Sequence, residues 1–176
     1  GDRDGSPLLT DIEFDAQGNM ILGIMDMHAS QLGHRNADLC GSCCPEDARQ
    51  VGDVLQAVRD KTAQDCEYSI QFTPEYYSDN HIHAESAMGA LAVHFTADFD
   101  GVLGTMMDPV GIWSSGVMLW DNQTGNKQNT GGGPGYETTY SSSSNQGKFG
   151  KANSLGDVET LGQVPPLEIG NFIWID

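Results

Sequence analysis

The chain has 176 residues, of which 38% are hydrophobic, and its formal net charge at pH 7 is −17. This length is sufficient for one domain with a hydrophobic core. The acidic balance argues against nucleic-acid binding, which needs a basic surface, and against docking on anionic membranes. No apolar run reaches the roughly 18 residues of a membrane-spanning helix, so we expect no membrane insertion. The chain begins at Gly1 without a signal peptide, which suggests a processed or internal piece of a protein.

Alternating apolar and polar residues predict β-strands along most of the chain. The expected strands cover residues 8–15, 19–27, 50–59, 66–72, 116–121, 155–161 and 169–176, together with a hairpin at residues 89–108. Residues 28–47, 73–85 and 126–135 are expected to be loops because they are rich in polar residues, glycine and proline. Residues 50–59 could form a short helix by composition, but a strand is favoured because it would pair with residues 66–72. Little helix is expected anywhere.

The clearest feature of the sequence is a hairpin that occurs twice. Residues 10–26 and 89–108 share an alternating strand, an acidic turn with a glycine, and a second apolar strand that ends in aspartate. Self-similarity of this kind indicates a repeated supersecondary unit. It predicts an all-β fold that is β-propeller-like, either a partial or a small propeller of antiparallel blade hairpins, with a β-sandwich as the alternative.

All cysteines of the chain fall in one polar stretch. They are Cys40, Cys43, Cys44 and Cys66. In an acidic chain rich in glycine and serine, we interpret them as disulfides that staple an insert at about residues 28–66. Their pairing stays open. The alternative is a zinc site of Cys40 and Cys43 with His28 or His34, although a second Cys-x-x-Cys or a spaced histidine pair is missing.

Two acidic groups are candidate calcium ligands. Asp11, Glu13 and Asp15 alternate along a predicted strand, so their side chains share one face. Asp98 and Asp100 lie in the acidic turn of the second hairpin. Neighbouring carboxylates repel one another unless water or a cation compensates, and calcium takes oxygen ligands of this kind. The alternative is a solvated acidic face with ordinary turn residues.

Further polar residues suggest weaker candidates. His81, His83 and Glu85 have the alternate spacing of a transition-metal site, with an ordinary polar loop as the alternative. Ser86 beside His83 is the only nominal nucleophile and base, but it lacks the nucleophile-elbow motif, and neighbouring strand residues face opposite ways. We therefore expect no catalytic residues and no enzyme.

The sequence also contains candidate sites of glycosylation. Asn122 begins an Asn-Gln-Thr triplet on an expected exposed turn. Ser141, Ser142, Ser143 and Ser144 form a run that suits O-linked sugar. An unmodified flexible loop is the alternative for the serine run.

Most of the chain resembles a known kind of segment. The stretches PLLTDIEFDAQGNMILGIMD, HAESAMGALAV, MMDP followed by SSGVMLWDNQTG, and GKFGKANSLGDVETL resemble the propeller-like segment that precedes SdrD B-like (Cna-B-type) repeats in large secreted bacterial surface proteins. The closing EIGNFIWID resembles the first strand of such a repeat. The resemblance implies an extracellular or cell-surface location and supplies no catalytic residues. The cysteine insert departs from it.

The final strand has no hairpin partner in the sequence. We expect a propeller-like domain at residues 1–164, followed by a hinge and strand at residues 165–176. The apolar residues of that strand are Ile169, Phe172, Ile173, Trp174 and Ile175. Such a strand must join a sheet, either in its own domain or in a neighbouring copy, and the second option repeated head to tail builds a filament. The sequence thus suggests a structural filament subunit, or alternatively an adhesin that binds glycan or protein.

Overall fold

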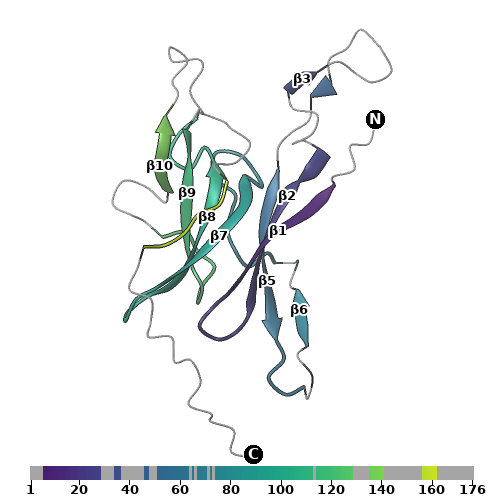
Figure 1. Ribbon diagram of the computed structural model, residues 1–176, viewed down its shortest axis with the longest axis vertical. Helices are drawn as coiled ribbons and strands as arrows, with labels where there is room; N and C mark the ends of the chain where they lie inside the picture. The colour runs from purple at the N-terminus through teal and green to yellow at the C-terminus, as the bar shows by residue number, and fades with distance from the viewer. Residues whose placement is uncertain are drawn as a thin grey trace, which may run out of the picture.

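The structure is a computed structural model that describes residues 6–28, 34–36, 46–47, 51–63, 65, 67–70, 72, 74–112, 114–128, 135–140 and 156–161. These residues form strands joined by turns and loops, as Figure 1 shows. The strands are β1 (Pro7–Phe14), β2 (Met20–Asp26), β3 (His34–Asn36), β4 (Glu46–Asp47), β5 (Gly52–Arg59), β6 (Tyr68–Ile70), β7 (Ala87–Phe95), β8 (Asp100–Met107), β9 (Ser114–Asp121) and β10 (Gly135–Tyr140).

Two four-stranded antiparallel sheets make up the body of the described structure. Sheet 1 has the order β1-β2-β5-β6, and sheet 2 has the order β10-β9-β8-β7. The short pair β3-β4 lies between β2 and β5 along the chain and forms a separate small sheet. Each copy of the doubled hairpin opens one of the two large sheets. The prediction of an all-β fold is therefore confirmed.

Three segments differ from the sequence-based expectation. Residues 28–47 were expected to be a loop but contain β3 and β4, and β10 was not expected. Residues 156–161 were expected to be strand, yet they form none; the Thr160 hydroxyl donates to the Val93 carbonyl of β7 at 2.9 Å. A strand needs a free sheet edge to pair with as well as an alternating pattern. Strand β10 pairs antiparallel with β9, which offers such an edge.

Glycines bring strand β7 close to sheet 1. A Cβ atom on Gly23 of β2 would lie 2.0 Å from the Gly89 carbonyl oxygen, and one on Gly52 of β5 would lie 2.2 Å from the Ala87 carbonyl oxygen. The Thr10 hydroxyl lies 2.9 Å from the carbonyl oxygens of both Gly23 and Gly89. The absence of side chains at Gly23 and Gly52 therefore allows backbone from the two sheets to meet directly.

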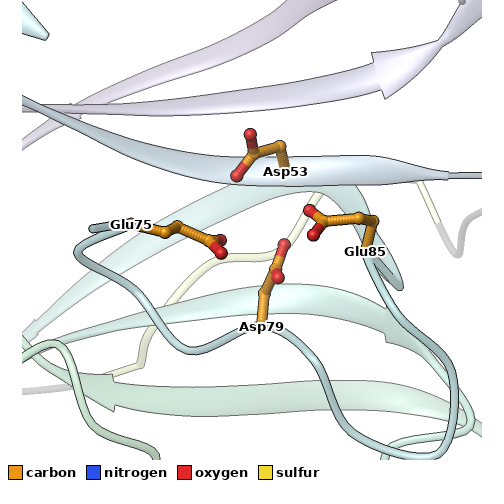
Figure 2. A group of neighbouring side chains, drawn as sticks. All are labelled: Asp53, Glu75, Asp79 and Glu85. Atoms are coloured by element: carbon orange, nitrogen blue, oxygen red, sulfur yellow. The ribbon is translucent and has the colours of Figure 1, made fainter. Parts of the chain in front are cut away.

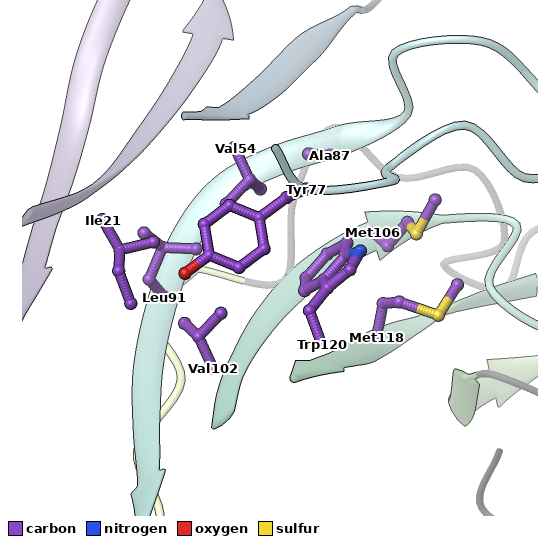
Figure 3. Packing of buried hydrophobic residues seen from close by; sticks show 9 residues of the cluster. All are labelled: Ile21, Val54, Tyr77, Ala87, Leu91, Val102, Met106, Met118 and Trp120. Atoms are coloured by element: carbon purple, nitrogen blue, oxygen red, sulfur yellow. The ribbon is translucent and has the colours of Figure 1, made fainter. Parts of the chain in front are cut away.

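The main hydrophobic core lies between the two sheets (Figure 3). Its buried members are Ile21, Val54, Tyr77, Ala87, Leu91, Val102, Met106, Met118 and Trp120. Trp120 is fully buried, and its indole N–H donates to the Ser78 carbonyl at 3.0 Å. The core thus joins both sheets to the segment at residues 74–86, which connects β6 to β7.

The opposite face of sheet 1 carries a second apolar cluster. Its buried residues are Leu22, Leu55 and Ala57, with Met20, Ile24 and Tyr68 packed against them. In the strand register, Ile12 of β1 lies opposite Leu22, which lies opposite Leu55. Phe14 likewise lies opposite Met20. Residues paired in this way share a face, so apolar rows run across the sheet and end at β1.

Candidate functional site

Four carboxylates meet beside the first half of β5. Asp53 comes from β5, whereas Glu75, Asp79 and Glu85 come from the segment at residues 74–86 (Figure 2). One carboxylate oxygen from each residue lies within 4.8 Å of the others. In the part of the chain that the structure describes, this is the single group of three or more acidic, histidine or cysteine side chains close enough to hold one ion.

Aromatic side chains fix the first half of this segment onto sheet 2. The rings of Tyr76 and Tyr77 pack edge to face with centroids 5.1 Å apart. The Tyr77 hydroxyl donates to the Asn122 side-chain oxygen at 2.9 Å, and the Tyr76 hydroxyl donates to the Asn122 carbonyl at 2.8 Å. These bonds, together with that from Trp120 to Ser78, hold the backbone just before Asp79 in place.

Backbone contacts fix the other end of the segment. The Gly52 N–H donates to the Glu85 carbonyl at 2.9 Å, and Gly52 forms a parallel bridge with Ser86. The Glu85 N–H donates to the Asn80 side-chain oxygen at 3.0 Å. Glu85 adopts φ 51, in the left-handed region that non-glycine residues seldom occupy. Its carboxylate is thereby held beside Asp53.

The centre of the cluster is buried and lacks hydrogen-bond donors. Asp79 is 0% exposed, and neither of its carboxylate oxygens has a hydrogen-bond partner. Asp53 Oδ1 and Glu75 Oε1 are also buried without a partner. A buried carboxylate without a donor or a compensating charge is costly, so protonation of these groups or a cation among them would stabilise the folded protein.

Burial and mutual repulsion raise every pKa in the cluster. Loss of solvent, followed by the charges of Glu75, Glu85 and Asp53, raises the pKa of Asp79 to about 9. Loss of solvent, followed by the charges of Glu85 and Asp53, raises the pKa of Glu75 to about 7. Burial is also the main cause that raises the pKa values of Asp53 and Glu85. The cluster therefore holds protons more strongly than ordinary carboxylates do.

In a solution stripped of divalent cations, the protein is expected to lose stability as the pH rises from about 5 to about 9. The unfolded chain releases the protons of Asp79 and Glu75 near their ordinary pKa values of 3.8 and 4.5, whereas the folded chain keeps them up to about 9 and about 7. The folded state thus binds more protons within this window, and deprotonation there favours unfolding. Thermal unfolding in EDTA, followed by circular dichroism, measures the effect.

The variant Asp79→Asn is the control for this pH dependence. It keeps the side-chain shape but carries no titrating proton, so its melting temperature should change less between these pH values than that of the wild type. A wild-type melting temperature that is constant or rises toward about pH 9 would contradict the raised pKa values.

The structure does not place the carboxylates of Asp11, Glu13 and Asp15 around one possible ion position. The Asp11 carboxylate accepts the Leu91 backbone N–H at 2.7 Å, which ties β1 to β7. Asp15 is 4% exposed and accepts the backbone N–H groups of Gln17 and Asn19 at 2.9 and 2.8 Å. Glu13 lies between them in the sequence, and burial and nearby acidic charges raise its pKa. The structure thus places Asp11 and Asp15 in separate backbone contacts and does not gather the trio into one group of ligands, and calcium binding by these residues stays a prediction.

Asp98 and Asp100, the second group of predicted calcium ligands, lie in different surroundings. Asp100 accepts the Asn122 side-chain N–H at 2.7 Å and the Ala16 backbone N–H at 3.3 Å. Asp98 is exposed in the turn between β7 and β8. Asp98 and Asp100 do not belong to a group of three or more such side chains among the described residues, and calcium binding by this pair stays a prediction.

Asn122 is buried rather than exposed. It is 2% exposed, its side-chain oxygen accepts the Tyr77 hydroxyl, and its side-chain nitrogen donates to Asp100. The expectation that this residue lies on an exposed turn is wrong, and a sugar on its amide nitrogen would disrupt these contacts. Ser141, Ser142, Ser143 and Ser144 lie outside the described residues.

The predicted histidine sites are not assembled. His83 Nε2 lies 2.8 Å from Asp108 Oδ2, while Glu85 belongs to the carboxylate cluster. The Ser86 hydroxyl is buried and donates to the Asp79 carbonyl at 3.4 Å. The structure therefore does not bring His81, His83 and Glu85 together as one group of metal ligands, and Ser86 does not pair with His83.

The remaining candidates lie outside the described residues. They are Cys40, Cys43, Cys44 and Cys66, and the strand residues Ile169, Phe172, Ile173, Trp174 and Ile175. The disulfides and the partner of the final strand stay predictions.

Sequence reasoning missed Asp53, Glu75 and Asp79 as members of one site. One signal was present, because Asp53 is a lone charge in the otherwise apolar start of β5. Glu75 and Asp79 flank the two neighbouring tyrosines of a loop that also contains Glu85. Such a pattern indicates acidic groups near a core, but it does not indicate that they meet.

Comparisons with known proteins do not assign the chain to a family. No protein-family model, no curated protein and no solved structure matches it.

Within the described parts of the chain, no helix has the length and apolar character needed to cross a bilayer.

Proposed function

We propose that this chain is an extracellular structural protein, a subunit of a cell-surface or matrix filament whose copies join by β-strand addition. One observation carries the proposal. Strand β1, an edge strand of sheet 1, exposes large apolar side chains. They are Leu8, Leu9, Ile12 and Phe14, with exposed fractions of 41%, 49%, 45% and 49%.

The apolar rows of sheet 1 favour β1 as an acceptor strand. Ile12 and Phe14 lie at the ends of rows whose other members, Leu22 and Met20, are more buried. No strand among the described residues pairs with the second edge of β1. An added strand would satisfy the free backbone groups of that edge and would bury Ile12 and Phe14.

The donor in this proposal is the strand at residues 169–175. Its sequence IGNFIWI is apolar and has no hairpin partner along the chain. A donor at one end of a subunit and an acceptor on another surface form a heterologous contact, which builds an open filament when repeated. In this proposal the two meanders of four strands act as propeller-like blades, and a sandwich of the same two sheets is the alternative arrangement.

The location outside the cell rests on composition and resemblance. The acidic, glycine-rich chain with clustered cysteines suits an oxidising environment, in which the cysteines form disulfides. The quoted stretches resemble segments of secreted bacterial surface proteins. In this proposal the protein is not an enzyme, and its partners are copies of itself.

Removal of residues 167–176 is expected to convert an assembling protein into monomers, because the donor strand is lost. The same result is expected for Ile12→Lys, which places a charge on the acceptor face. Size-exclusion chromatography with negative-stain imaging measures assembly. Ile70→Lys is the matched control, since Ile70 is 40% exposed on β6 at the opposite edge of sheet 1, and this variant should assemble like the wild type.

Unchanged assembly after the deletion would overturn the proposed donor, and equal effects of Ile12→Lys and Ile70→Lys would overturn the proposed acceptor. A wild-type protein that stays monomeric at all concentrations would overturn filament formation and would favour a binding module for glycan or protein.

A further inference from the structure

We propose that Asp53, Glu75, Asp79 and Glu85 form a Ca²⁺ site that fastens the segment at residues 74–86 to strand β5. This site is separate from the assembly surface on β1, so either proposal can fail without the other.

Asp79 is the strongest reason to place a cation in the cluster. Its side chain is 0% exposed and points toward the other carboxylates (Figure 2), and neither of its oxygens accepts a hydrogen bond. An ordinary structural aspartate accepts backbone N–H groups, as Asp15 does from Gln17 and Asn19. Asp79 has no such donors. A cation would supply the missing compensation to both of its oxygens.

No basic side chain in the described parts of the chain performs this role. Lys127 is close enough for its charge to act on Asp79, but its ammonium group donates to the Asn80 carbonyl oxygen. No lysine, arginine or histidine among the described residues forms an ion pair with any of the four carboxylates. Within the described part of the chain, the cluster therefore lacks a compensating positive charge, and a cation from solution can supply it.

The geometry of the oxygens suits Ca²⁺. Calcium binds six to eight oxygens at about 2.3–2.6 Å, so two ligands on opposite sides lie about 4.6–5.2 Å apart. The four side chains offer oxygens within 4.8 Å of one another, and carboxylates that bind through both oxygens supply further ligands. Mg²⁺ demands a tighter octahedron with opposite ligands about 4 Å apart and retains several waters, which suits four converging carboxylates less well.

The cluster is also reachable from solvent. Asp53 and Glu85 line a surface pocket together with Ile24, Val51 and Gly52. A cation can therefore reach two of the four carboxylates from the surface beside β5. Once bound, it would join β5 of sheet 1 to the segment that leads directly into β7 of sheet 2.

Isothermal titration of the metal-free full-length protein with calcium chloride tests the site. We expect Ca²⁺ to bind and to raise the melting temperature, because a ligand that binds only the folded state stabilises it. Asp79→Asn should weaken the affinity by about tenfold or more, since it removes a charged ligand. Asp98→Asn is the matched control, because the same change on an exposed turn should leave binding intact. Magnesium chloride should bind more weakly than calcium chloride.

Circular dichroism shows whether each variant is folded. If Asp79→Asn does not fold, Glu85→Gln serves in its place, because Glu85 is only partly buried. The proposal is overturned if calcium neither binds nor raises the melting temperature at millimolar concentration, or if Asp98→Asn loses binding while Asp79→Asn keeps it. Equal binding by the wild type and Asp79→Asn would likewise place calcium elsewhere.

Discussion

Trp120→Ala is expected to lower the free energy of unfolding by about 3–5 kcal/mol, the usual cost of truncating a fully buried large aromatic residue. Trp120 is 0% exposed within the core between the sheets (Figure 3) and packs edge-on against Tyr77 with ring centroids 6.4 Å apart. The substitution opens a cavity at the point where both sheets and the segment at residues 74–86 meet. It also leaves the Ser78 carbonyl without the indole donor.

Urea unfolding followed by circular dichroism measures this loss. Phe72→Ala is the matched control, because Phe72 is 68% exposed and truncation of an exposed aromatic should change stability by about 0.5 kcal/mol or less. A similar, small effect of both substitutions would show that Trp120 is not part of the folding core.

Gly23→Ala is expected to destabilise the protein by about 3 kcal/mol, at the upper end of the usual cost of overpacking. The new methyl group would lie 2.0 Å from the Gly89 carbonyl oxygen, and Leu91 stands behind it with its Cγ 3.2 Å away. The obstacle is backbone, so no side-chain rotation relieves the clash. The two sheets must separate, and the Thr10 contacts to both carbonyls are lost with them.

The control for this prediction is Gly111→Ala. A Cβ atom at Gly111 meets nothing within 4 Å, so this variant should unfold at nearly the same urea concentration as the wild type. If Gly23→Ala were as stable as Gly111→Ala, this result would contradict the close contact between β2 and β7 at Gly23.

The local pattern of the sequence was sufficient to predict most strands. Alternating residues in β1, in β6 and in the β7–β8 hairpin identified these elements, because side-chain periodicity is a property of the strand itself. Strand β5 was ambiguous with a short helix and was favoured as the partner of β6. The repeated hairpin also indicated that two similar units exist. The sequence pattern did not predict β10, which forms by pairing with β9, and it wrongly predicted a strand at residues 156–161, which form none although β7 beside them is an edge strand.

The sequence by itself therefore determined an acidic, all-β chain with a doubled hairpin. Only the tertiary structure decided which acidic residues meet. Asp11 and Asp15, which lie close together in the sequence, accept separate backbone N–H groups, whereas Asp53 and Asp79 come from different elements and share one buried cluster. The physical reason is that periodicity fixes the face on which a side chain lies, while the packing of sheets and loops fixes its neighbours, its burial and its charge.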